Sequence, residues 1–253
     1  MLQSIGALTL GVAEDAGGMA LVAVRATRAL FPLRIDRDEF FRSLIAFGEA
    51  SLPIVFATAA FTGAIMVVQG AIYVKQFGVY NFVGWYTGFS TFREVGPLLV
   101  GLMFSGRVGA NNTSELATMR VTEQLDAMRI LALDVYGILI LPRFVSMVIA
   151  LFALVIFGDL VAVLSGALCA RILLGLDYVL FFNSLLGRLE PWDFLVGLER
   201  ALVYGGLIAI VSTHYGLNAK GGSTGVGRAV NAQVVGCAVA LFLADYIITT
   251  VQR

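Results

Sequence analysis

"FREVGPLLVGLMFSGRVGANNTSELATMRVTEQLDAMR", residues 92–129, decides the fold of this chain. The stretch begins with a charged pair, Arg93 and Glu94, beside a run of apolar residues. It ends in a segment that alternates charged and apolar side chains. Ionisable residues inside an apolar span are costly, and they usually face the interior of a helix bundle or a watery cavity. The stretch therefore indicates a membrane helix whose charged residues face the bundle interior or a cavity, followed by a helix outside the membrane.

The composition of the whole chain agrees with a membrane protein. Of its 253 residues, 59% are hydrophobic and 13% are charged, and the mean hydropathy is +0.89. Soluble domains carry roughly 25% charged residues. Because only helices and closed barrels can satisfy the backbone in lipid, and long apolar runs favour helices, we predict an all-α integral membrane protein. The formal net charge is zero, and we expect no nucleic acid partner.

Runs with few or no charged residues predict about five transmembrane helices. The runs are residues 51–74, 76–106, 144–170, 201–219 and 229–252. A shorter apolar piece, residues 178–187, is too short to cross and favours a re-entrant or interfacial helix.

The residues before the first span predict a helix at the membrane surface. Asp36, with Glu39 three residues later, forms a helix start of the capping-box kind. Apolar residues then follow at helical spacing, namely Phe40, Phe41, Leu44, Ile45 and Phe47. The pattern fits an interfacial helix, and it fits equally an amphipathic helix packed on the bundle. We expect residues 1–50 to be an N-terminal cytoplasmic segment and residues 51–253 to be the transmembrane domain.

The distribution of Lys and Arg predicts the orientation. With the N-terminus in the cytoplasm, eleven of these residues fall in inside segments and four, including Arg253, in outside segments. Cytoplasmic loops carry the excess of positive charge. Five spans then leave the C-terminus outside and place residues 107–143 in the cytoplasm.

The cytoplasmic segment predicts an amphipathic helix between spans 2 and 3. Asn112, with Glu115 three residues later, is a candidate helix start. Apolar and charged positions alternate beyond it, with both signs of charge. Such a helix suits docking into a groove on another protein, and the alternative is a helix that lies on lipid headgroups.

Arg93 and Glu94 need partners other than each other, because neighbouring helical residues point about 100° apart. The other charged residues in or near spans are the candidate partners: Asp159, Glu199, Arg200 and Asp245. Two interpretations remain open. The charges either form an internal network that fixes helix packing, or they line a cavity that admits an anionic lipid headgroup.

The sequence offers no enzyme chemistry. Both cysteines lie in apolar stretches, no metal-binding spacing occurs, and His214 is the only histidine, for which we expect a packing or interfacial role. "GSTGVGRA", residues 222–229, has the glycine spacing of a P-loop, but Arg228 replaces the required Lys and Ala229 replaces the hydroxyl. We expect no catalytic residues, no metal and no cofactor on this chain.

Three motifs resemble the MlaE (YrbE) permeases, the membrane subunits of ABC transporters that move lipids between bacterial envelope membranes. They are "REVGPLLVGLMFSGRVGA" from residue 93, "TEQLDAMRILALD" from residue 122 and "PRF" at residues 142–144. "KGGSTGVGRAVNAQVV", residues 220–235, is similar to the tail of Mce-associated members. The family commonly has Pro after the Asp that ends the cytoplasmic helix, whereas here Val135 follows Asp134.

The resemblance implies a coupling helix at about residues 113–133 that docks on a separate ATPase subunit, where ATP and magnesium bind. Its implied coupling residues are Glu115, Met119, Glu123, Leu125, Asp126, Met128 and Arg129. It also implies a translocation cavity at Arg93, Glu94 and Pro97.

The implied function is the permease subunit of an ATP-driven phospholipid transporter in a bacterial inner membrane. The implied partners are the ATPase, an MCE-domain periplasmic protein, and a second permease copy or a paralogue. Two alternatives remain: a proton-coupled secondary transporter with Glu94 and Asp159 as carriers, and a structural anchor of an envelope complex.

Overall fold

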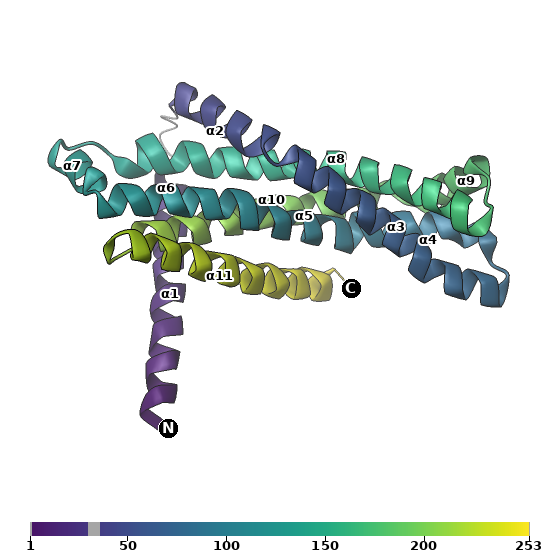
Figure 1. Ribbon diagram of the computed structural model, residues 1–253, viewed down its shortest axis with the longest axis horizontal. Coiled ribbons are helices and arrows are strands. Elements are labelled where there is room, and N and C mark those ends of the chain that lie inside the picture. Colours follow the sequence, from purple (N-terminus) through teal and green to yellow (C-terminus); the bar gives the residue numbers. More distant parts are fainter. Residues whose placement is uncertain (1, 30–35, 253) are drawn as a thin grey trace. The chain divides into compact units, whose positions relative to one another are not determined.

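The computed structural model describes residues 2–29 and 36–252, and every regular element in these residues is a helix (Figure 1). The α-helices are, in chain order, α1 (Leu2–Ala29), α2 (Arg37–Glu49), α3 (Leu52–Phe77), α4 (Val83–Ser90), α5 (Gly96–Phe104), α6 (Ala110–Val121), α7 (Gln124–Ile130), α8 (Leu141–Leu174), α9 (Tyr178–Arg188), α10 (Pro191–Leu217) and α11 (Gly222–Val251). A 3₁₀ turn, η1 (Tyr80–Phe82), precedes α4. Three π-helical turns are η2 (Thr91–Val95), η3 (Ser105–Gly109) and η4 (Tyr136–Ile140).

Four of the helical segments in the described residues are long and apolar enough to cross a membrane. They are Leu52–Phe77, Tyr136–Leu174, Pro191–Leu217 and Gly222–Val251. The prediction of an all-α integral membrane protein is confirmed, and these segments contain four of the five predicted spans almost entirely. The remaining run, residues 76–106, is broken at its start, because Gly78 ends α3 in a left-handed conformation (φ +71°). From Val83 the chain is helical without a gap through α4, η2, α5 and η3, and two π turns interrupt the α-helix. Arg34 and Arg253, which contribute to the predicted charge bias, lie outside the described residues.

The chain forms two compact units. Unit 1 comprises Met1–Phe47, Ser105–Met147 and Gly206–Val239, and unit 2 comprises Gly48–Phe104, Val148–Gly205 and Ala240–Arg253. Helices α8, α10 and α11 contribute residues to both units. Each contact and each cavity described below lies within one unit.

Two of the π turns precede a proline. Pro97 and Pro142 have no N–H to donate to the carbonyl four residues earlier, and their rings would clash with it. The Gly96 N–H instead bonds to the Thr91 carbonyl, and the Leu141 N–H bonds to the Tyr136 carbonyl. Each of these bonds spans five residues, which is the π-helical pattern. The sequence motifs "GP" and "LP" thus widen the helix at η2 and at η4.

Helix α2 begins as predicted but divides its apolar residues between two faces. The Asp36 carboxylate accepts the Asp38 N–H at 3.0 Å, which caps the helix. Phe47 is buried, whereas Phe41 and Ile45 are 57% and 60% exposed. An apolar face that stays exposed suits contact with lipid.

Helices α3 and α8 pack through small residues in unit 2. A Cβ on Gly63 would lie 1.8 Å from the carbonyl oxygen of Ala162, so the two backbones touch. The Ser165 hydroxyl donates to the Ala60 carbonyl, and the Cys169 thiol donates to the Ala64 carbonyl at 3.6 Å. Small residues and hydrogen bonds to backbone carbonyls are typical of close packing between membrane helices.

Helix α9 is a short helix, as predicted, and it packs on α4 in unit 2. A Cβ on Gly84 would lie 2.1 Å from the carbonyl oxygen of Phe181. The Ser184 hydroxyl donates to the Asn81 carbonyl at 2.6 Å and accepts the Trp85 N–H at 3.3 Å. These contacts fix the helical segment that leads into Arg93.

We predict that Gly63→Ala destabilises the protein, because the new methyl group meets backbone rather than a movable side chain. The expected loss of unfolding free energy is about 1–3 kcal/mol. Gly187→Ala is the matched control, since no atom lies within 4 Å of its added Cβ, and it should change stability by less than about 1 kcal/mol. Thermal unfolding in detergent measures both. Equal melting temperatures for the two variants would contradict the close α3–α8 contact.

Candidate functional site

Arg93 lies on the π turn η2 and is held by a residue that the sequence analysis did not select. Its Nη1 atom donates to Asp193 Oδ1 on α10 at 3.2 Å, and the Asp193 side chain is 10% exposed. The guanidinium also lies over the Phe89 ring, 5.4 Å from its centroid. The partner of Arg93 is therefore Asp193 rather than one of the four predicted residues. Asp193 lies between the apolar runs 178–187 and 201–219, outside every predicted span.

Glu94 points to a different neighbour. Its carboxylate accepts a hydrogen bond from the Thr249 hydroxyl on α11 at 3.2 Å. As predicted, Arg93 and Glu94 are satisfied separately rather than by each other. Among the described residues, no ion pair is found for Glu94, so its charge remains available to a ligand.

A cavity of about 370 Å³ contains both residues. It lies in unit 2, and its lining residues are Phe89, Ser90, Arg93, Glu94, Arg200, Thr249 and Gln252. Pro97, the third predicted cavity residue, is buried and does not line this space. The contribution of Pro97 is the π turn that orients the two charged side chains. A cavity of this size with charges of both signs suits a polar headgroup.

Arg200 and Asp245 pair with each other across α10 and α11. The Arg200 side chain is 1% exposed, and its guanidinium donates to Asp245 Oδ1 and, at 3.0 Å, to the Thr249 hydroxyl. The Tyr204 hydroxyl donates to the same Asp245 oxygen at 2.6 Å. Thr249 thus joins the Arg200 network to Glu94. A buried charge pair of this kind is costly to break, because the remaining charge is left without a partner.

The other two predicted partners differ in their surroundings. Glu199 is exposed, and its carboxylate accepts a hydrogen bond from Gln252 at 3.2 Å. Asp159 is 3% exposed, and neither of its carboxylate oxygens has a hydrogen-bond partner among the described residues. A Cβ on Gly96 would lie 2.6 Å from Asp159 Oδ1, so Asp159 abuts the end of η2. The sequence requires glycine there for this close approach.

The predicted coupling helix, residues 113–133, is a pair of helices rather than one helix. Helix α6 continues from η3 and begins at Ala110, so Asn112 does not cap it. The chain turns at Glu123, which has a left-handed conformation (φ +61°), and α7 follows (Figure 1). A second positive φ, +57° at Ala132, ends the segment. Residues 110–133 therefore form a helical hairpin in unit 1, hereafter the α6–α7 hairpin.

Buried apolar residues hold the hairpin together. Leu125 is fully buried in a cluster with Leu116, Val135, Leu139 and Ile140. Met119 and Met128 pack against the same cluster. Three of the predicted coupling residues thus shape the hairpin from inside, and Leu125 offers no surface to a partner.

Charged residues fix the turn between α6 and α7. Arg120 Nη1 donates to both oxygens of Asp126 at 2.7 Å, and Arg129 Nη1 donates to Asp126 Oδ1 at 3.2 Å. Glu115 instead pairs with Arg143 at 2.8 Å, and Arg143 also binds Glu39 on α2 at 3.1 Å. Asp126 and Glu115 therefore have structural partners within the chain. Glu123 remains exposed.

The exposed apolar residues of the hairpin lie at its far end. Ile130, Leu131 and Leu133 are 85%, 70% and 43% exposed. None of the three is among the predicted coupling residues, because the prediction assumed one continuous helix. They lie where α7 ends, on either side of the positive φ at Ala132. Hereafter this surface, Ile130, Leu131 and Leu133, is the apolar tip.

Two further predictions concern ligands. The described residues contain no cluster of three or more His, Cys, Asp or Glu side chains that could hold a metal ion. Residues 222–229 are the first turns of α11, so they lie in a helix and form no phosphate-binding loop between a strand and a helix.

The four long apolar segments are those of a multi-pass membrane protein. Residues 40–251 match the family described as Permease MlaE, and the chain belongs to this family. It is the permease subunit of an ABC transporter and not itself an ATPase. The family assignment excludes the alternative of a proton-driven secondary transporter and that of a purely structural anchor.

Similar proteins extend the match to nearly the full chain. A probable ABC transporter permease protein of Rickettsia conorii is 35% identical over 97% of this chain and 95% of its own length. A probable ABC transporter permease protein of Synechocystis is 31% identical over 85% of this chain and 82% of its own length. The chloroplastic protein TRIGALACTOSYLDIACYLGLYCEROL 1 of Arabidopsis thaliana is 29% identical over 80% of this chain and 58% of its own length.

We predict that Arg93 and Asp193 are energetically coupled. Arg93→Gln and Asp193→Asn should each lower stability in detergent, and the double variant should lose less than the sum of the two. The expected coupling energy is about 1 kcal/mol, because the Arg93 side chain is partly exposed. Arg171→Gln with Asp177→Asn is a control pair, because that pair is separated by 3.7 Å and exposed. Strict additivity at Arg93 and Asp193 would contradict the interaction.

Proposed function

We propose that this chain is the permease subunit of an ATP-driven phospholipid transporter in a bacterial inner membrane. The observation that carries the proposal is the cavity of about 370 Å³ with Arg93 and Glu94 on its wall. Among the similar proteins, the Arabidopsis relative bears the name of a galactolipid. The family and this name support a lipid substrate.

The cavity suits a headgroup rather than a whole lipid. Arg93 offers a guanidinium that can donate two parallel hydrogen bonds to a phosphate. Glu94 can accept from a hydroxyl or an amine of the same headgroup. The acyl chains would then lie against the apolar surfaces of the spanning helices, as they do in the bilayer. We propose that a second copy of the chain, or a paralogue, encloses the rest of the lipid.

ATP hydrolysis would reach the cavity through the α6–α7 hairpin. An ABC permease implies an ATPase partner, and ATP and magnesium would bind to that partner. The apolar tip would insert into a groove of the ATPase, since it is the exposed apolar surface of the hairpin. Glu123 and Arg129 would lie at the edge of that contact. Leu125, Met119 and Met128 would transmit the movement by holding the hairpin rigid.

We propose the remaining partner and the orientation from the family resemblance and the charge distribution. An MCE-domain periplasmic protein would receive or deliver the lipid. The excess of Lys and Arg in the segments assigned to the inside supports a cytoplasmic N-terminus. With the continuous helical run from α4 to η3 crossing as a fifth span, the C-terminus would lie in the periplasm. This orientation places the hairpin in the cytoplasm, where the ATPase would bind.

We predict that Ile130→Asp together with Leu131→Asp abolishes binding of the ATPase. Two carboxylates at the apolar tip would have to be desolvated in the groove, so retention should fall by at least about tenfold. Co-purification of the ATPase with the detergent-solubilised permease is the measurement. Leu186→Asp is the matched control, because Leu186 is 73% exposed on α9, away from the hairpin sequence. A wild-type chain that never retains an ATPase would refute the proposed function.

We predict that Arg93→Gln reduces the phospholipid that co-purifies with the complex, and ATP-driven phospholipid transfer between vesicles, by about tenfold. The reason is the loss of a charge-assisted contact to the phosphate. Lys75→Gln is the control, because Lys75 is exposed and forms no ion pair with the described residues. If Arg93→Gln retains both lipid and transfer, the cavity is not the headgroup site. Measurement of ATPase retention in the same variant separates this outcome from a failure of assembly.

A further inference from the structure

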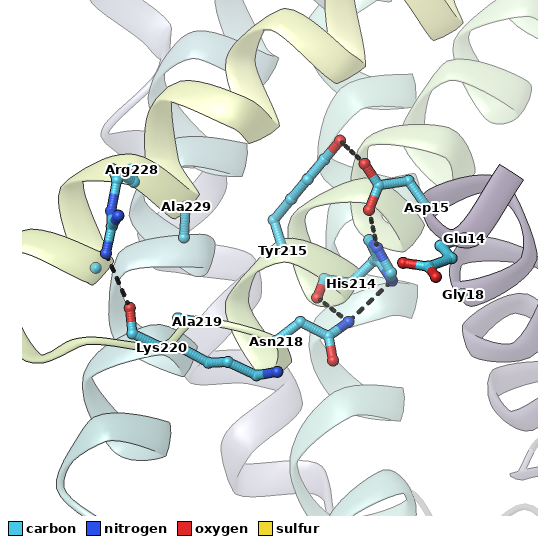
Figure 2. Close-up of a pocket in the computed structure, with 11 residues that line it drawn as sticks. Glu14, Asp15, Gly18, His214, Tyr215, Asn218, Ala219, Lys220, Arg228 and Ala229 are labelled. Carbon is cyan, nitrogen blue, oxygen red and sulfur yellow. Dashed lines mark hydrogen bonds and ion pairs between the residues drawn. The ribbon is translucent and has the colours of Figure 1, made fainter. Parts of the chain in front are cut away.

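A second polar cavity lies in unit 1, and the proposed transport route does not use it. Its volume is about 570 Å³. One wall belongs to α1, through Glu14, Asp15 and Gly18, and the other walls belong to the end of α10 and the start of α11. Figure 2 shows Glu14 and Asp15 of α1 on one side of this space and Arg228 on the opposite side, with the Lys220 side chain extending between them toward Asn218.

The wall on α1 is held against α10 by His214 and Tyr215. His214 is 5% exposed, and its Nε2 atom lies 3.3 Å from Asp15 Oδ1. The Tyr215 hydroxyl donates to Asp15 Oδ2 at 3.3 Å (Figure 2). A Cβ on Gly18 would lie 2.2 Å from the His214 ring, so α1 approaches α10 closely. His214 therefore packs between α10 and α1 and contacts Asp15, which is remote in the sequence.

Three charged side chains of the cavity have no charged partner in the part of the chain that the structure describes. Glu14, Lys220 and Arg228 form no ion pair there, whereas Asp15 is bound by His214 and Tyr215. Arg228 Nη2 donates to the Lys220 carbonyl at 3.4 Å, so the guanidinium lies beside the backbone from which the Lys220 side chain extends toward Asn218 (Figure 2). Charges that line a cavity without partners suit a ligand of complementary charge.

The turn between α10 and α11 leaves room beside these cations. Gly221 and Gly222 have φ of +94° and +68°, which glycine adopts without strain. The turn lies where one apolar segment ends, at Leu217, and the next begins, at Gly222. Lipid headgroups lie at the ends of spanning helices, and basic pockets between such helices bind phosphate headgroups.

We propose that this cavity binds a phospholipid headgroup that carries both a phosphate and a primary amine. Lys220 and Arg228 bind the phosphate, and Glu14 binds the ammonium from the opposite wall. A headgroup with phosphate and amine matches the separation of charge across the cavity, which a purely anionic or purely cationic ligand does not. Leu21 and Val24 on α1 are 57% and 45% exposed and provide apolar contact for the acyl chains.

The proposal goes beyond the proposed function, because it assigns a second headgroup site in the other unit. The site would hold a lipid of the leaflet that faces the hairpin side, and α1 would be its outer wall. Residues 2–29 precede the part of the chain that the family match covers, so this wall is an addition to the matched region. Binding at the site is measured without transport, so it can fail while the proposed function stands.

The experiment measures binding of single lipids to the full chain with its co-purified partners in detergent. The complex is delipidated and titrated with dioleoyl phosphatidylethanolamine, phosphatidylglycerol or phosphatidylcholine, and bound lipid is counted by native mass spectrometry. All variants carry Arg93→Gln and Glu94→Gln, so that the cavity in unit 2 contributes little to the bound lipid that is counted. We expect phosphatidylethanolamine to bind about tenfold more tightly than the other two lipids, because only its headgroup offers an ammonium with N–H donors.

Separate variants test the basic residues and the acidic residue of the site. Lys220→Gln with Arg228→Gln should weaken binding of phosphatidylethanolamine and phosphatidylglycerol alike, by about tenfold. Glu14→Gln should weaken only phosphatidylethanolamine and bring it to the level of phosphatidylglycerol. Lys75→Gln is the control and should change neither. The elution volume and the helical circular dichroism of each variant must equal those of the parent.

Three outcomes would overturn the proposal. The first is unchanged binding of phosphatidylethanolamine in the Lys220→Gln/Arg228→Gln variant. The second is a preference for phosphatidylethanolamine that survives Glu14→Gln. The third is displacement of the lipid by inorganic phosphate at concentrations equal to those of the lipid, which would assign the cavity to a soluble phosphate.

Discussion

A charged side chain inside an apolar helix must find a partner, and this constraint shapes unit 2. Arg200 on α10 finds Asp245 on α11, and Arg93 on η2 finds Asp193 on α10. Both pairs use α10, which thereby joins the segment before α5 to α11. Breaking the Arg200–Asp245 pair would leave Arg200 with neither water nor its charged partner, whereas Arg93 is partly exposed. Glu94 takes part in neither pair. It lines the cavity, and the Thr249 hydroxyl is its only hydrogen-bond partner among the described residues.

A second constraint comes from proline. Pro97 prevents a regular α-helix at the residues before it, and the π turn η2 is the result. The wider turn sets the directions in which Arg93 and Glu94 leave the helix. Pro142 acts in the same way on η4, next to the apolar cluster of the hairpin. Single π turns often accompany functional sites, and here both follow from the absence of one backbone N–H.

Local patterns predicted much of the fold but not the pairing of distant residues. Length and hydropathy predicted the long spans and α9, since both properties are visible in a short window. Asp193 was missed as the partner of Arg93 because the two are a hundred residues apart and nothing local links them. The turn at Glu123 was missed because positive φ favours glycine, and glutamate gives no indication of it. The contact of His214 with Asp15 joins residues almost two hundred positions apart.

Helix α10 contacts both functional regions, each within its own unit. Near its first turn, Asp193 binds Arg93 at the cavity of unit 2. At its last residue, Leu217 packs against the apolar cluster that holds Leu125 of the hairpin. The helix is continuous from Pro191 to Leu217 and contains 27 residues. Each region therefore depends on α10 through a contact of its own, since Asp193 fixes Arg93 in unit 2 and Leu217 closes the apolar cluster in unit 1.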